Sequence, residues 1–338
     1  MQFVLVLFLA SIAGMAASRL LIKNKLVPEA IKAISLDVTG TLLVHRLPIH
    51  EAYYNAFIDV NITDRPDLAD LKPAFKKAYK EMSQKYPCFG SGKVSDREWS
   101  HSLTHSLTYS LTYSLTHSLR WYLLIQDTIK LTGKSYSEAT LQRYFRSIYQ
   151  HYGSLEGYEI LPDAKEFLEK YSSRYLLGVT SNTPVRTMEN CLPSLGLSKY
   201  FKFFVCSQDV GHEKPSTHIY QRSMDEVRLF AQHTHLFPRS LTHSLTHSLT
   251  HLLTHSLQIK YYNPGIQPHE ILHIGDNLVS DYCGSIASNM QSLYLDRSGN
   301  SKVVNFSDYD ASGYSIDEAT LRQSTVRNFQ EIAELLKL

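Results

Sequence analysis

The sequence contains, at residues 33–43, the run Ala33-Ile34-Ser35-Leu36-Asp37-Val38-Thr39-Gly40-Thr41-Leu42-Leu43. Its apolar first half predicts a buried strand over 32–37, which ends on a lone carboxylate just before a glycine turn. In a parallel sheet, the carboxyl ends of the strands deliver side chains into a common crevice. Asp37 is therefore the first candidate for a functional side chain.

Three polar motifs follow this run in a fixed order. They are Gly178-Val179-Thr180-Ser181-Asn182, then Glu213-Lys214-Pro215, then His273-Ile274-Gly275-Asp276-Asn277 with Asp281 shortly after it. Each motif comes after a segment that is predicted to be a strand, at 175–180, 201–206 and 270–275. Alone, each of them also fits an ordinary turn or helix start. Their order and their places at strand ends favour one site shared with Asp37.

The alternation of predicted strands and helices indicates an α/β fold, with a parallel sheet and crossover helices. A fifth strand is predicted at 292–296, and helices are predicted at 162–173, 184–195, 215–229, 279–289 and 327–337.

A long segment between Asp37 and residue 162 has no convincing strand pattern. Its amphipathic stretches predict helices at 65–84, 121–132 and 138–151. We therefore assign 30–47 and 157–338 to the core, and 48–156 to a helical cap inserted after the first strand.

The composition is that of a soluble globular protein: of 338 residues, 43% are hydrophobic and 20% charged, with a formal net charge of +2. This balance gives no basic surplus for binding a nucleic acid. The four cysteines, Cys88, Cys191, Cys206 and Cys283, show neither metal-site nor disulfide spacing. We expect free, mostly buried thiols, which suit a reducing compartment.

Residues 1–20 form a hydrophobic segment in which Phe3 to Ala17 are almost wholly apolar and the first charged residue is Arg19. A bilayer span needs about 20 apolar residues, so this short run is more typical of a hydrophobic targeting leader or anchor. We expect secretory or organelle targeting, and any membrane contact only through this segment. Because a basic start is missing, a cytoplasmic location is the alternative.

Two segments, 100–119 and 240–257, repeat the tetrapeptide Ser-Leu-Thr-His, with Tyr in place of some His. A repeat of four residues does not keep the leucines on one apolar face, since their position moves by about 40° per repeat around a helix. The codons TCA-CTC-ACT-CAC encode this peptide, which indicates translated simple-sequence DNA. We therefore expect loops or disorder here. The alternative is a metal-binding ladder of His243, His247, His251 and His255.

The ordered motifs resemble those of the haloacid dehalogenase (HAD) superfamily of hydrolases. This resemblance covers about residues 32–300 without the repeats, and it implies a Rossmann-like core with a helical cap. Closer likeness to one subgroup comes from Tyr86-Pro87-Cys88-Phe89-Gly90, from Arg97-Glu98-Trp99 with Trp121, and from Asp281-Tyr282.

The chemistry of these residue types points to phosphoryl transfer. A carboxylate such as Asp37 can attack phosphorus and form an aspartyl-phosphate, provided that a cation screens the two negative groups. Mg²⁺ prefers oxygen ligands, and the predicted set is Asp37, Asp276, Asp281 and the main-chain carbonyl of Thr39. Ser181, Asn182 and Lys214 are predicted to bind phosphate oxygens, with Lys214 also near the nucleophile.

The residue at position 39 departs from the pattern that the resemblance implies. Phosphatases of the superfamily usually carry a second aspartate there, which protonates the leaving oxygen and then activates water, whereas this chain has Thr39. General acid–base catalysis contributes about 10²–10⁴-fold, so we expect a slow phosphatase that prefers good leaving groups. In the subgroup that the chain resembles, this aspartate is typically replaced.

These observations predict a Mg²⁺-dependent hydrolase, most simply a phosphatase of a small phosphorylated metabolite. The alternative is a catalytically impaired protein that keeps the fold for binding or scaffolding. Dehalogenation is disfavoured, because it does not need the acidic pair Asp276 and Asp281. The sequence specifies neither the substrate nor the oligomeric state.

Overall fold

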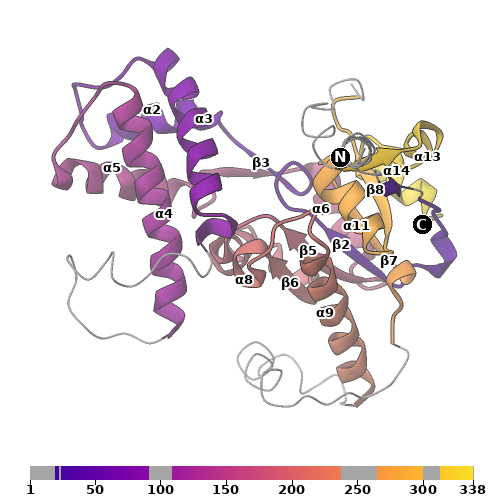
Figure 1. The fold of residues 1–338 in the computed structure, drawn as a ribbon. Coiled ribbons are helices and arrows are strands. Elements are labelled where there is room, and N and C mark those ends of the chain that lie inside the picture. Colours follow the sequence, from indigo (N-terminus) through magenta and orange to yellow (C-terminus); the bar gives the residue numbers. More distant parts are fainter. Residues whose placement is uncertain (1–19, 23, 91–108, 237–264, 300–312, 338) are drawn as a thin grey trace, which may run out of the picture.

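The structure, a computed structural model, describes residues 20–22, 24–90, 109–236, 265–299 and 313–337. It has the predicted architecture: a Rossmann-like core with a parallel sheet flanked by helices, and an inserted helical cap (Figure 1).

Six parallel strands form the central sheet, in the order β10-β8-β7-β2-β5-β6. Their bounds are β10 Thr325–Val326, β8 Gln291–Leu295, β7 Ile271–Gly275, β2 Ala33–Leu36, β5 Leu176–Ser181 and β6 Phe203–Cys206. The five predicted strands are all present, close to their predicted bounds. Two-residue β10 was not predicted, because so short a strand carries no period-two pattern.

Strand β2 is buried on both faces, since its side chains alternate between two hydrophobic clusters. Ile34 and Leu36 pack in one cluster with α6 (Pro162–Tyr171) and α14 (Phe329–Leu335). Ala33 packs in the other with α9 (Thr217–Leu236). The sheet is therefore covered by helices on both sides, as a parallel sheet requires.

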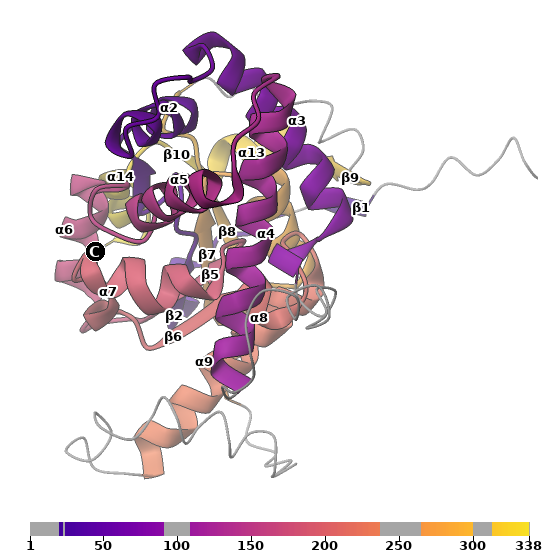
Figure 2. The same cartoon turned by 90° about the vertical axis from the view of Figure 1, so that its left-hand side faces the viewer.

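The cap consists of α2 (Ile49–Asp59), α3 (Leu68–Lys85), α4 (Tyr109–Leu131) and α5 (Glu138–His151). Figure 1 shows these helices as a group of their own beside the core, and in Figure 2 the same group faces the viewer, in front of the core. They join it through an antiparallel pair, β3 (Leu43–His45) and β4 (Tyr158–Ile160). Helix α2 was missed in the sequence, although it supplies Phe57, whose ring stacks on Tyr144 at 4.0 Å in the core of the cap.

The remaining elements are short. They are η1 Pro28–Ala30, η2 Cys88–Gly90, η4 Thr187–Cys191, α7 Leu192–Ser194, η5 Ser198–Tyr200, α8 Ser207–Val210, η6 Pro268–Glu270, η7 Leu278–Cys283, α11 Gly284–Ala287 and α13 Glu318–Gln323, with a parallel pair of β1 Leu20–Ile22 and β9 Tyr314–Ile316. The predicted helices 184–195 and 279–289 are thus each split, into η4 with α7 and into η7 with α11.

The first repeat differs from its expectation. Helix α4 begins at Tyr109, so the expectation of a loop over 100–119 is wrong for residues 109–119. A drift of about 40° per repeat weakens an amphipathic pattern, but it does not prevent the main-chain hydrogen bonds of a helix. Residues 100–108 and the second repeat, with the alternative histidine ladder, lie outside the described residues.

Residues 1–19 of the predicted leader also lie outside the described residues, and Leu20 belongs to β1. Among the helices that the structure describes, none has the length and apolar character that a membrane crossing needs. All four cysteines are buried thiols outside any disulfide, as predicted.

Candidate active site

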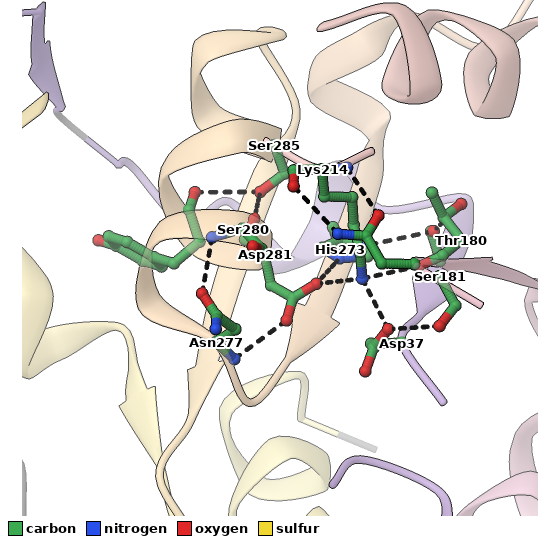
Figure 3. Close-up of polar contacts among 12 residues, drawn as sticks. Asp37, Thr180, Ser181, Lys214, His273, Asn277, Ser280, Asp281 and Ser285 are labelled. Atoms are coloured by element: carbon green, nitrogen blue, oxygen red, sulfur yellow. Dashed lines mark hydrogen bonds and ion pairs between the residues drawn. The ribbon is translucent and has the colours of Figure 1, made fainter. Parts of the chain in front are cut away.

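Asp37 follows β2 at the centre of the sheet and is buried, with 7% of its surface exposed. Because β2 lies between β5 and β7, the residues at the ends of these strands meet around this carboxylate. Its Oδ1 accepts hydrogen bonds from the Ser181 hydroxyl at 2.8 Å and from Lys214 Nζ at 2.6 Å (Figure 3). The predicted convergence of Ser181 and Lys214 on Asp37 is therefore present.

Lys214 is buried and donates all three of its ammonium hydrogens. Besides Asp37, the acceptors are Asp281 Oδ1 at 2.5 Å and the carbonyl oxygen of Thr180 at 3.0 Å. Burial alone favours the neutral amine, but the charges of Asp281 and Asp37 outweigh it and raise the pKa of Lys214. The side chain is thus held as an ammonium between two carboxylates.

Asn182 is placed differently from its prediction as a phosphate ligand. Its Oδ1 accepts from the main-chain N–H of Lys214 at 2.7 Å, and its Nδ2 donates to the Lys214 carbonyl oxygen at 3.0 Å. The amide thereby fixes the main chain of Lys214, so its structural role is to position the lysine. Only its second N–H is left for the predicted contact with phosphate.

The predicted metal ligands Asp37, Asp276 and Asp281 come together, with one carboxylate oxygen of each lying within 4.8 Å of the others. Oxygens that share an octahedral Mg²⁺ at 2.0–2.1 Å lie about 2.9–4.2 Å apart, so small side-chain movements suffice to bring these three onto one ion. An all-oxygen donor set also suits this ion. The main-chain carbonyl of Thr39 as a further ligand stays a prediction.

The charges at this cluster also fit a divalent cation. Three carboxylates face one ammonium, which leaves two formal negative charges without a counter-charge. Burial, followed by the charges of Asp37 and Asp281, raises the pKa of Asp276 to about 7. Burial likewise raises the pKa of Asp37, although Lys214 opposes it. A cation here would lower both pKa values and stabilise the ionised cluster.

Asp281 is the most firmly held carboxylate of the three. In addition to Lys214, it accepts from the main-chain N–H of Asn277 at 3.0 Å and from His273 Nε2 at 3.0 Å. Burial opposes its ionisation, but Lys214 and His273 outweigh burial and lower the pKa of Asp281. With three donors placed, a lone pair remains on Oδ2 for a metal or for a metal-bound water.

His273 was not predicted to have a role, although it lies in the motif His273-Ile274-Gly275-Asp276-Asn277. It is fully buried in β7, and burial lowers its pKa, which keeps the ring neutral. The ring lies between Asp281, whose Oδ1 is 3.0 Å from Nε2, and the Ser35 hydroxyl, which is 3.1 Å from Nδ1. The available signal was a histidine that directly precedes Ile274-Gly275-Asp276. The role of this histidine is to position Asp281.

Two glycines make room for the carboxylates. A Cβ on Gly40 would lie 2.0 Å from Asp276 Oδ2, and a Cβ on Gly275 would lie 2.2 Å from Asp281 Cγ. Gly40 also has a φ of +87°, a left-handed conformation that L residues avoid. The acidic cluster therefore requires both glycines, and the turn after Asp37 requires Gly40 as well.

Gly40→Ala is expected to weaken Mg²⁺ binding by at least about tenfold, since the new methyl group displaces Asp276. Gly196→Ala is the matched control: this glycine has a φ of +69°, yet nothing lies within 4 Å of its Cβ position. Both variants carry a strain of about 1–2 kcal/mol, and only Gly40→Ala crowds the cluster. Calorimetric titration with Mg²⁺ separates them. Equal affinities in the two variants would contradict the steric role of Gly40.

Comparison with known proteins gives a consistent result. A family model described as haloacid dehalogenase-like hydrolase matches residues 31–236. The chain is 23% identical over 268 residues to "Haloacid dehalogenase-like hydrolase domain-containing protein 3" of Xenopus laevis, covering 79% of this chain and 84% of that protein. The human protein of the same name is 25% identical over 267 residues, covering 78% and 82%.

Among solved structures, the chain is similar in fold to the HAD hydrolase YfnB of Bacillus subtilis, whose crystal structure contains magnesium. The TM-score is 0.52 at 16% identity, with 91% of this chain and 99% of that chain covered. The family match covers more than half of the sequence and includes the Asp37, Ser181 and Lys214 motifs. This chain therefore belongs to the haloacid dehalogenase-like hydrolases.

Proposed function

We propose that the protein is a Mg²⁺-dependent phosphatase that transfers the phosphoryl group of a small substrate to Asp37 and then to water. The observation that carries this proposal is the cluster of three carboxylates around a single buried ammonium, with the nucleophile among them. A haloacid dehalogenase reaction needs no such excess of negative charge, whereas phosphoryl transfer depends on cations that neutralise the reacting group.

In the first step, an oxygen of Asp37 attacks phosphorus and the bond from phosphorus to the leaving oxygen breaks. Lys214 holds Asp37 in place and offers positive charge beside the incoming phosphoryl group, and the Ser181 hydroxyl is within reach of the same region. In the second step, water attacks the aspartyl-phosphate and frees both phosphate and Asp37. The water proton passes to a phosphate oxygen.

The three carboxylates would hold the magnesium ion, which supplies charge neutralisation for the phosphoryl oxygens. Asp281 is kept ionised by Lys214 and His273, so this part of the site is preorganised for a cation. Asp276 and Asp37 have raised pKa values, and a bound cation would favour the ionised form of both.

The test is hydrolysis of p-nitrophenyl phosphate, whose leaving group needs no proton. We expect turnover with Mg²⁺ and none after chelation with EDTA. We also expect Mg²⁺ to raise the melting temperature, because saturation to about 100 times Kd stabilises the folded state by about 2.7 kcal/mol. Stabilisation by Mg²⁺ without any turnover would instead support the catalytically impaired binding protein. If Mg²⁺ neither supports turnover nor raises the melting temperature, the proposed metal site is contradicted.

Thr39 sets the expected substrate range of the reaction, because its hydroxyl cannot donate a proton to a poor leaving group at neutral pH. Thr39→Asp is expected to raise the ratio of kcat/KM for glycerol 1-phosphate to that for p-nitrophenyl phosphate by at least about tenfold. Thr39→Asn is the isosteric control without an acid and leaves this ratio low. An unchanged ratio in Thr39→Asp would show that protonation of the leaving group does not limit the reaction.

A further inference from the structure

A cavity of about 310 Å³ lies between the cap and the carboxyl ends of the strands. On the core side it is lined by Thr39 and Thr183, each two residues beyond a member of the phosphate site, Asp37 or Ser181. The cavity therefore lies next to the position that the reacting phosphoryl group would occupy. Its volume is at the lower end of the range for small-molecule pockets.

Aromatic rings form most of the cap wall of this cavity. They are Tyr53, Phe75, Tyr79, Phe89, Trp121, Tyr152 and Tyr158. The rings also support one another: Trp121 lies 5.5 Å from Tyr152, and Tyr53 lies 5.3 Å from Phe75. Such a wall favours a flat, apolar ring system over a flexible polar chain.

Three side chains that line the cavity carry a buried polar atom without a hydrogen-bond partner in the described structure. These atoms are Arg120 Nε, Tyr152 Oη and Thr183 Oγ1. The residues are only 6%, 4% and 8% exposed, so bulk solvent hardly reaches these atoms and their partners would come from whatever fills the cavity. Buried polar atoms are almost always satisfied, and three exceptions around one cavity indicate a polar ligand.

The cavity is also positively charged. Arg120 and Arg186 line it, and none of its lining residues is acidic. Neither arginine forms an ion pair within the described part of the chain. Arg120 donates to the Ser83 hydroxyl at 3.2 Å and lies over the Phe89 ring at 4.8 Å.

Arg186 is held in a similar way, without a carboxylate. It donates to the main-chain carbonyl oxygen of Tyr149 at 2.6 Å, and its guanidinium lies 3.6 Å from the centroid of the Tyr149 ring. Two guanidinium groups in an aromatic cavity would gain most from a planar anion, which accepts from the fork of N–H donors.

We propose that the cavity binds the leaving group of an aryl phosphate that carries a carboxylate or a similar planar anion on its ring. This inference rests on the proposed function. The phosphoryl group lies at Asp37, the ring lies against the aromatic wall, and the second anion lies at Arg120.

The absence of an acid at position 39 fits the same substrate class. When Asp37 attacks phosphorus, the phosphorus–oxygen bond breaks and its electron pair remains on the aryl oxygen. A phenolate, whose conjugate acid has a pKa of about 10, leaves without receiving a proton far more readily than an alkoxide does. Two independent features, the cavity wall and Thr39, therefore select the same kind of leaving group.

The experiment compares 3-carboxyphenyl phosphate with phenyl phosphate, whose phenols leave with similar ease. The wild-type protein is expected to hydrolyse the carboxylated substrate with at least tenfold higher kcat/KM. Arg120→Gln is expected to reduce this preference to less than twofold. Arg143→Gln, an exposed arginine on cap helix α5, is the matched control and keeps the preference.

Equal kcat/KM for the two substrates in the wild-type protein would overturn the inference and leave the proposed phosphatase intact. Calorimetric binding of the product 3-hydroxybenzoate provides a readout that does not need turnover. Binding that Arg120→Gln weakens at least tenfold supports the cavity assignment even in a protein without phosphatase activity. If 3-hydroxybenzoate does not bind to the correctly folded wild-type protein, the cavity assignment is overturned.

Discussion

Asp37→Asn is expected to abolish hydrolysis of p-nitrophenyl phosphate, with a fall in kcat of at least ~10³-fold. The amide cannot attack phosphorus, and the cluster also loses one of its anionic ligands. The fold is expected to persist, because Asn has the same shape and still offers an oxygen to Ser181 and Lys214. Activity within tenfold of the wild type would contradict the assignment of Asp37 as the nucleophile.

The matched control is Asp225→Asn, at an exposed aspartate on α9 away from the site. It makes the same chemical change and is expected to keep wild-type kcat. Circular dichroism of all three proteins then separates loss of chemistry from loss of structure.

Lys214→Met is expected to destabilise the protein by about 3–5 kcal/mol in the presence of EDTA, because Asp37 and Asp281 are left as buried carboxylates without their shared ammonium. Urea denaturation measures this difference. Lys165→Met, on the exposed face of α6, is the control and stays within about 0.5 kcal/mol of the wild type. A loss of less than 1 kcal/mol in Lys214→Met would contradict a central role of the ion pairs.

Acid and Mg²⁺ are both expected to reduce the loss caused by Lys214→Met. Without the ammonium, burial and mutual repulsion raise the pKa of both carboxyl groups above their unfolded values, so the penalty grows as pH rises through the raised pKa. It is smallest below the unfolded pKa of about 4, where both carboxyl groups are protonated in either state. Mg²⁺ provides the missing positive charge and restores part of the stability at neutral pH.

The core and the nucleophile were predictable because the responsible patterns are local. A run of apolar residues that ends on Asp37 before Gly40 predicts both a central strand and a side chain at its carboxyl end. The same reasoning applies to Ser181 and Lys214, which the structure places within hydrogen-bond distance of Asp37.

Other parts of the site depend on contacts that no local pattern contains. Asn182 has the right chemistry for a phosphate ligand, but its amide is used to fix Lys214, which is 32 residues away. His273 acts through Asp281 across a turn. Arg120 directly follows the first repeat, and its place in the cavity wall results only from the packing of the cap on the core.

The cap shows how tertiary packing can override weak local signals. Helix α2 has no side-chain cap and a short apolar pattern, yet it buries Tyr53 and Phe57 against its neighbours. Helix α4 extends into a repeat with poor helical periodicity. For α2, helix formation therefore depends on the neighbouring structure more than on intrinsic propensity.

The most direct test of the account is to identify the phosphorylated residue. The protein is mixed with p-nitrophenyl phosphate and Mg²⁺, quenched in acid during turnover, reduced with borohydride and digested for mass spectrometry. Reduction converts an aspartyl-phosphate into homoserine, and the account predicts this conversion at position 37 alone, only with Mg²⁺ present. Turnover without any modification at Asp37, or conversion at another carboxylate, would contradict it.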